Sequence, residues 1–163
     1  MKSIAQPMKQ VVDWSAAVWA GLISGLIFLA LNMLLTWNLL GTPWIIFRMI
    51  ASVVMGSDVL PPPATFDLTI FLTALIIHLV LSVAFASLLA VIIHRWGLIV
   101  GFIGGALFGL VLFVINYYAI SYFFPWFFPL RNWTIVLSHI AFGAFAGGLY
   151  ESMEEEVFVP DTE

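Results

Sequence analysis

The sequence predicts an all-α integral membrane protein of four transmembrane helices, arranged as two tandem helical hairpins with a short interfacial helix in the first outer loop. Three observations support this fold class: the composition, four long uncharged runs, and a repeated spacing of glycine, asparagine and histidine. Of the 163 residues, 63% are hydrophobic and only 9% are charged, whereas a soluble domain carries about 25% charged residues. This composition excludes soluble globular, disordered and nucleic-acid-binding proteins.

The four uncharged runs are the predicted membrane spans. A helix of about 20 residues crosses a hydrocarbon core, and each run is close to that length or longer. The runs are Ala16–Trp37, Leu68–His94, Leu98–Phe123 and Trp133–Tyr150. Tryptophan favours the headgroup level of a bilayer, and six tryptophans lie near the ends of these runs: Trp14, Trp19, Trp37, Trp96, Trp126 and Trp133.

The connection between the first two spans contains an apolar segment that is too short to cross a membrane. Thr42 and Pro43 resemble an N-cap followed by a proline at the first helical position. We therefore expect an interfacial or re-entrant helix over residues 43–55. It would hold Trp44 and Arg48 at the membrane surface.

The remaining connections are shorter and have clear signals. Thr65 or Asp67 is placed to cap the second span. Residues 94–97 form a tight turn, which makes the second and third spans antiparallel neighbours. The aromatic loop after the third span, with Trp126 and Arg131, is expected to lie at the outer interface.

The basic residues give the predicted orientation. Three of them share one side of the membrane and two share the other: Lys2, Lys9 and Arg95 against Arg48 and Arg131. Because the side richer in lysine and arginine is usually cytoplasmic, we expect both termini there. The N-terminal segment 1–15 and the acidic tail 151–163 then flank a single transmembrane domain over residues 16–150.

The spans also contain an internal repeat. Glycine, glycine and asparagine have identical spacing in the first and third spans, at Gly21, Gly25 and Asn32 and again at Gly105, Gly109 and Asn116. The second and fourth spans each hold one intramembrane histidine with small residues four and eight positions later, at His78 and His139. The pattern predicts two copies of one hairpin, residues 16–96 and 97–150, related by a pseudo-two-fold axis along the membrane normal.

Seven glycines lie at helical spacing within the spans: Gly21, Gly25, Gly101, Gly105, Gly109, Gly143 and Gly147. Small residues let helix backbones approach one another in lipid, so this stripe predicts tight bundle packing. The alternative is that it leaves room for a cofactor against a helix.

Four intramembrane polar residues, Asn32, His78, Asn116 and His139, are all expected in the outer half of the bilayer. Buried polar groups need partners, so we interpret them as an interhelical hydrogen-bonded cluster without a metal. One alternative is axial ligation of haem b by His78 and His139, with Arg48 or Arg131 facing the propionates. Another is a path for protons or a small solute.

Two segments carry a resemblance to known proteins. Residues Met55–Asp67, with Gly56-Ser57-Asp58 and Pro61-Pro62-Pro63, and the turn His94-Arg95-Trp96-Gly97 resemble those of small bacterial inner-membrane proteins, some of which are labelled automatically as symporters. The resemblance covers about Trp19 to Tyr150. It implies a bacterial inner membrane and no established activity.

The function predicted from these features is non-catalytic. The chain has no cysteine, no phosphate-binding glycine loop and no intramembrane carboxylate, so no enzyme motif is present. We expect an accessory or assembly subunit whose glycine faces and interfacial helix pack against a larger membrane complex. Its partners would be the lipid bilayer and other subunits or itself, not nucleic acid. The alternatives are a homo-oligomeric carrier or channel for a small solute or protons, and a small b-type cytochrome.

Overall fold

The computed structural model describes residues 8–130 and 132–161, and these residues are mostly helical. The elements in chain order are β1 (Met8–Val11), α1 (Trp14–Leu40), α2 (Ile45–Met55), the 3-10 helix η1 (Ser57–Val59), α3 (Leu68–Ile93), α4 (Leu98–Phe123), the 3-10 helix η2 (Pro125–Leu130), α5 (Trp133–Met153) and β2 (Val157–Pro160). Four of these helices, α1, α3, α4 and α5, are long and apolar enough to cross a membrane. The four predicted spans are therefore confirmed as helices.

Side-chain caps fix where three of the long helices begin. Asp13 accepts hydrogen bonds from the backbone N–H groups of Ser15 and Ala16, so α1 starts before the predicted span. Asp67, one of the two caps that the sequence allowed, accepts from the N–H of Ile70 and caps α3. Asn132 caps α5 in the same way. Each cap satisfies backbone donors that a helix start leaves unpaired.

Helix α2 begins at Ile45, two residues after the predicted start at Pro43. The Thr42 hydroxyl accepts weakly from the backbone N–H of Trp44 and donates to the carbonyl of Ala64 at 2.8 Å. The hydrogen bond between Thr42 and Ala64 joins the two ends of the connection between α1 and α3. Residues 42–44 therefore lie outside the helix. The predicted short apolar helix in this connection is therefore confirmed.

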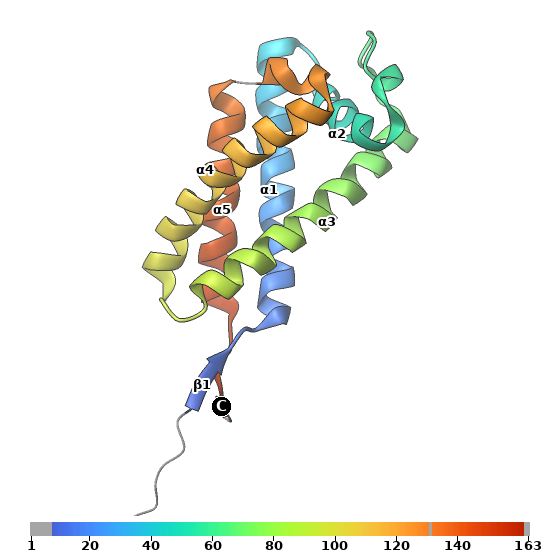
Figure 1. The fold of residues 1–163 in the computed structure, drawn as a ribbon. Coiled ribbons are helices and arrows are strands. Elements are labelled where there is room, and N and C mark those ends of the chain that lie inside the picture. Colours follow the sequence, from blue (N-terminus) through green and yellow to red (C-terminus); the bar gives the residue numbers. More distant parts are fainter. Residues whose placement is uncertain (1–7, 131, 162–163) are drawn as a thin grey trace, which may run out of the picture.

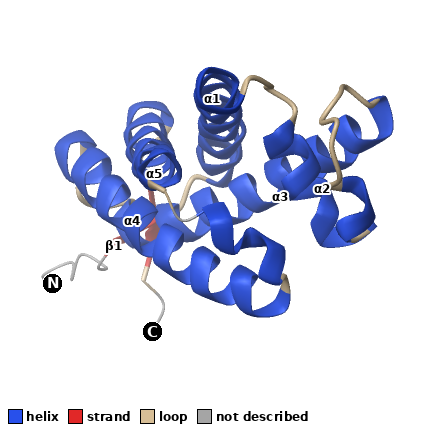
Figure 2. Cartoon of the chain, turned by 90° about the horizontal axis from the view of Figure 1, so that it is seen from above, coloured by secondary structure: helices blue, strands red, loops and turns tan. Residues whose placement is uncertain are grey.

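The helices form an uneven bundle. Helices α1 and α5 lie side by side, with α2 and α3 on one side and α4 on the other (Figures 1 and 2). Helix α3 packs on α1, α4 packs closely on α5, and α2 packs on α3. Although a short turn joins α3 and α4, they make little contact with each other. The bundle is therefore closed on three sides and open between α3 and α4.

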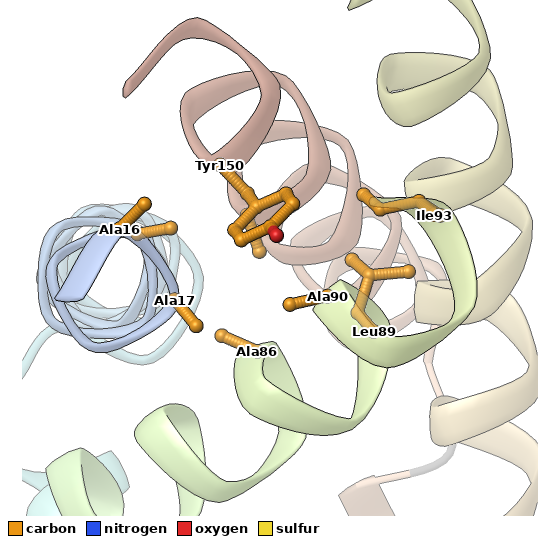
Figure 3. Close-up of a cluster of buried hydrophobic side chains, with 9 residues drawn as sticks. Ala16, Ala17, Ala86, Leu89, Ala90, Ile93 and Tyr150 are labelled. Carbon is orange, nitrogen blue, oxygen red and sulfur yellow. The ribbon is translucent and has the colours of Figure 1, made fainter. Parts of the chain in front are cut away.

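The tightest core lies at the end of the bundle near the termini. Alanines of α1 and α3 meet there, and Tyr150 of α5 points between the two helices with only 1% of its surface exposed (Figure 3). The Tyr150 hydroxyl accepts a hydrogen bond from the backbone N–H of Asp13. The cluster comprises Ala16, Ala17, Ala20, Ala86, Leu89, Ala90, Ile93, Ala146 and Tyr150.

A small sheet corrects the prediction of a purely helical chain. Strands β1 and β2 pair antiparallel, and the Lys9 ammonium lies 3.2 Å from the Asp161 carboxylate. The backbone N–H of Glu155 also donates to the Asp13 carboxylate. The N-terminal segment and the acidic tail thus join each other through β1 and β2 at one end of the bundle (Figure 1). The strands are too short and too irregular in pattern to have been predicted from periodicity.

Glycines bring α4 and α5 into backbone contact. A Cβ atom added at Gly105 would collide with the carbonyl oxygen of Gly143, and one at Gly109 would collide with that of His139. Gly101 and Gly147 approach in the same way. Only residues without a side chain permit this spacing, and the close approach is favourable because it gains dispersion contacts along both helices.

The α1–α3 contact uses the corresponding glycines of the first hairpin. A Cβ at Gly21 would lie 2.7 Å from the Cα of Val83, and one at Gly25 would lie 2.6 Å from the Ser82 hydroxyl oxygen. Here the partner helix presents Ser82 and Ala86 where α5 presents Gly143 and Gly147. All seven glycines singled out in the sequence therefore pack helices of this chain together, so those faces are not free for another subunit.

Candidate functional site

A cavity of about 380 Å³ lies at the end of the bundle opposite the termini. All five α-helices and η2 contribute to its wall. The lining residues are Phe28, Ile46, Ile50, Val53, Ile77, His78, Leu81, Phe85, Phe113, Asn116, Tyr117, Ile120, Ser121, Phe127, Ile135 and His139. Three of the four polar residues singled out in the sequence, His78, Asn116 and His139, are therefore brought to one site.

Helix α2 and η2 cover the outer side of this cavity. Ile46, Ile50 and Val53 of α2 contribute to the lining, as does Phe127 of η2. The two covering elements are joined by a hydrogen bond from the Trp126 indole Nε1 to the Ser52 hydroxyl at 2.9 Å. The predicted interfacial segments thus meet and form a common cover.

Arg48 holds the loop that follows α2. Its Nη1 donates to the carbonyl of Val59 at 2.7 Å, and its Nε and Nη2 donate to the carbonyl of Thr65. The guanidinium is thereby committed to backbone carbonyls instead of facing the cavity. Trp44 packs near the same loop, with its ring 4.9 Å from that of Phe66. Arg131, the fourth predicted interfacial residue, lies outside the described residues.

His78 connects α3 to α1. Its ring nitrogen Nε2 donates to the carbonyl oxygen of Gly25 at 2.9 Å, and the Ser82 hydroxyl lies 3.3 Å from the same nitrogen. Because Gly25 has no side chain, the imidazole reaches the α1 backbone directly. The bond is an interhelical one of the kind expected for a polar residue within a span.

His139 is oriented by its own helix. Its Nδ1 donates to the carbonyl of Ile135 one turn earlier, at 2.8 Å. Aromatic rings fix the imidazole from two sides: Phe28 lies edge-on at 5.0 Å between ring centroids and Phe113 at 5.7 Å. Neither contact requires the imidazole to be charged.

The two histidines therefore have opposite tautomers. A carbonyl oxygen only accepts hydrogen bonds, so the proton of neutral His78 is on Nε2 and that of neutral His139 is on Nδ1. The other nitrogen of each ring, His78 Nδ1 and His139 Nε2, carries a lone pair. No hydrogen bond from residues 8–130 or 132–161 reaches either of these nitrogens. Each of these two nitrogens can therefore accept a hydrogen bond.

Asn116 and Ser121 add further polar groups from α4. Within the described part of the chain, the Asn116 amide makes no hydrogen bond, and the Ser121 hydroxyl oxygen is buried without a partner. The neighbouring Tyr117 hydroxyl, by contrast, donates to the carbonyl of Phe128 at 3.3 Å. Asn116 is half-buried and lines the cavity, so its amide can form hydrogen bonds with a molecule bound there.

Asn32 does not join the other three residues. It is fully buried in α1, where its Nδ2 donates to the carbonyl of Phe28 at 2.9 Å. Its Oδ1 has no partner among the described residues, and it does not line the cavity. The expected cluster of two asparagines and two histidines is therefore a cavity with three of them and a separate buried amide.

Three contacts in the structure bear on the alternative of a haem held between His78 and His139. The ring of Phe28 lies between the two imidazoles, stacked on His78 at 5.0 Å and edge-on to His139 at 5.0 Å. His78 Nε2 is already bound to Gly25, and Arg48 is bound to loop carbonyls.

The phenylalanines are the part of the site that the sequence analysis missed. Phe28, Phe85, Phe113, Tyr117 and Phe127 all line the cavity. The sequence does contain a signal for these aromatic residues. Phe113 lies one helical turn before Asn116, and Tyr117 lies one turn before Ser121, on the same helix face. An aromatic residue spaced three or four positions from an intramembrane polar one indicates a shared wall.

Comparisons of the chain with protein-family models, with curated proteins and with solved structures give no match. The geometry of the cavity and of the bundle is therefore the basis for the function proposed below.

Proposed function

We propose that the chain is a multi-pass protein of a bacterial inner membrane, built from two tandem hairpins and with both termini in the cytoplasm. The four long apolar helices suit a membrane protein. The sheet with Lys9 and Asp161 lies at one end, and Arg48 lies at the other. The corresponding glycines of the α1–α3 and α4–α5 contacts support the repeat.

Topology reporters test this orientation. Fusions after Met153 and within residues 56–60 are expected to report opposite sides of the membrane, with the Met153 fusion in the cytoplasm. Equal signals from both positions would contradict the four-span arrangement.

Within the membrane, the proposed role is that of a non-catalytic accessory or assembly subunit of a larger complex. The observation that carries it is the one-sided packing of α4. Its buried residues form a single stripe, Gly101, Gly105, Gly109 and Leu112. The rest of the helix exposes large apolar side chains, including Ile103 and Leu107, which a transmembrane helix of another subunit could cover.

Native purification tests the accessory role. A tagged chain, extracted in mild detergent, is expected to migrate as a complex larger than itself with a second membrane protein in fixed stoichiometry. Leu107→Trp on α4 should reduce recovery of that protein about tenfold, because a bulky ring disturbs a close helix contact. The matched control is Val80→Trp on α3, which is equally exposed. Recovery of the chain alone, or equal loss with both variants, would contradict the role.

A second candidate, a homo-oligomeric carrier of a small solute, is favoured by one observation. The cavity brings His78, Asn116 and His139 together within the spans, as a binding site on a transport path would require. Purified chain in liposomes should then move solute without another protein. Liposomes with and without the chain that show equal flux would leave the accessory role as the proposal.

A further inference from the structure

The walls of the cavity suit a flat apolar molecule. Five aromatic side chains from four elements line it: Phe28, Phe85, Phe113, Tyr117 and Phe127. Phe113 and Tyr117 stack on one another, with centroids 5.8 Å apart and planes 22° apart. Aromatic rings favour offset-stacked or edge-on contacts with another ring, so a planar ligand gains more here than a flexible chain.

The size of the cavity suits a small ligand. Its volume of about 380 Å³ falls within the roughly 300–1,000 Å³ of typical small-molecule sites. A substituted aromatic ring fits this space. The wall is formed partly by α3 and α4, which make little contact with each other.

The polar groups in the wall define what such a ring must carry. The His78 Nδ1 and His139 Nε2 lone pairs accept hydrogen bonds, and the Asn116 amide both donates and accepts. None of these groups has a partner in the described residues. An acyl chain from a lipid would leave all of these groups without a hydrogen bond, which costs free energy for each group. A hydroxyl group, by contrast, pairs with a donor or with an acceptor.

The uncharged wall of the cavity favours a neutral ligand. Of the described residues that line the cavity, none is aspartate, glutamate, lysine or arginine. Both histidines have their protons committed to carbonyl oxygens in the neutral state. An ion would therefore enter an apolar wall without a counter-charge, which is strongly unfavourable.

We propose that the cavity binds a neutral, lipid-soluble aromatic ring bearing hydroxyl groups, of the hydroquinone or phenol class. The ring packs against Phe28 and Phe113, and its hydroxyl groups donate to His139 Nε2 and pair with the Asn116 amide. No covalent or redox step is involved. This binding site goes beyond the accessory role, because it exists whether or not the chain assembles with another subunit.

The test uses the full chain in lipid nanodiscs and a pair of matched probes. Decylhydroquinone and its dimethyl ether have the same ring and alkyl chain, but only the first donates hydrogen bonds. Under argon, each probe partitions between nanodiscs with the chain and empty nanodiscs. Decylhydroquinone should bind about tenfold more tightly per lipid than the ether. Equal binding of both probes, or binding of neither, would overturn the proposal.

Two variants locate the binding. Asn116→Leu should weaken decylhydroquinone binding about tenfold and leave the melting temperature unchanged, since the described chain offers that amide no partner. Asn38→Leu is the matched control on an exposed part of α1, outside the cavity, and should not alter binding. Ile120→Trp should abolish binding by filling the space. Unchanged binding in Asn116→Leu, or in Ile120→Trp, would show that the probe sits elsewhere and would overturn the assignment.

Discussion

The two halves of α4 contact their surroundings in different ways. Over the first half, Gly101, Gly105 and Gly109 place the helix backbone directly against α5. Over the second half, Phe113, Asn116 and other large or polar side chains line the cavity. Both halves belong to one helix of membrane-spanning length, and side-chain size distinguishes the closed region from the open one.

This difference follows from how helices associate in lipid. Lipid tails are as apolar as leucine, so the hydrophobic effect does not drive helices together inside a bilayer. Close backbone approach provides the attraction instead, and only small residues allow it. Where the small-residue stripe of α4 ends after Gly109, close contact gives way to a cavity wall. Asn116 and Ser121, which make no hydrogen bond within the described residues, are found on that wall.

The largest expected effect comes from breaking the closed half. Gly105→Leu should destabilise the fold by about 3 kcal/mol, because its side chain would have to displace the α5 backbone at Gly143. Gly148→Leu is the control, since a Cβ there meets only the Phe102 side chain at 3.3 Å. The measurement is the free energy of unfolding in detergent micelles. Equal losses for both variants would contradict the proposed importance of the α4–α5 backbone contact.

The helices could be predicted because mean hydropathy and helix length are properties of a whole segment. The caps at Asp67 and the turn at 94–97 were also recognisable from short local patterns. Asn32 and Asn116 show the limit of such reasoning. They occupy identical positions in the repeat, yet Asn32 is fully buried and Asn116 lines the cavity. Which one faces open space depends on how far α3 stands from α4, and no local pattern encodes that distance.

A second prediction concerns the end of the bundle where the strands meet. Asp13→Ala should cost about 1 kcal/mol at neutral pH, because it removes the α1 cap and the acceptor for Glu155. In the folded chain, hydrogen bonds from the backbone N–H groups of Ala16 first and Glu155 second lower the pKa of Asp13 below 3.8. A lowered pKa stabilises the fold above the unfolded value, and this contribution is lost as pH falls through the folded pKa.

The pH dependence gives that prediction its check. Unfolding free energies of the wild type and Asp13→Ala should differ at pH 7 and converge below about pH 3.8, as the carboxylate becomes protonated. Asp58→Ala, in the η1 turn at the other end, serves as control. A difference that stayed constant over this range would show that the Asp13 charge contributes nothing to the cap.

A third prediction separates the two histidines. His78→Leu removes a bond between α3 and α1 and should cost about 0.6 kcal/mol, the average for interhelical hydrogen bonds in membranes. His139→Leu removes a bond within one helix turn and should cost less. Chemical unfolding of both variants in the same detergent measures the difference. A larger loss for His139→Leu would mean that the ring contacts of His139 with Phe28 and Phe113 outweigh the hydrogen bond between α3 and α1.

The smallest expected effect comes from closing the open half, and it has the opposite sign. Ile120 lines the cavity from the second half of α4, so Ile120→Trp places an indole in space that no side chain of the described residues fills. Cavity filling typically stabilises a fold by about 0.5 kcal/mol or somewhat more, and this variant should raise the melting temperature slightly in the absence of any ligand. Ile115→Trp, on a part of α4 that is 56% exposed, is the control and should leave the melting temperature unchanged. If Ile120→Trp destabilised the chain as strongly as Gly105→Leu, the second half of α4 would be closely packed too, and the contrast between its two halves would be wrong.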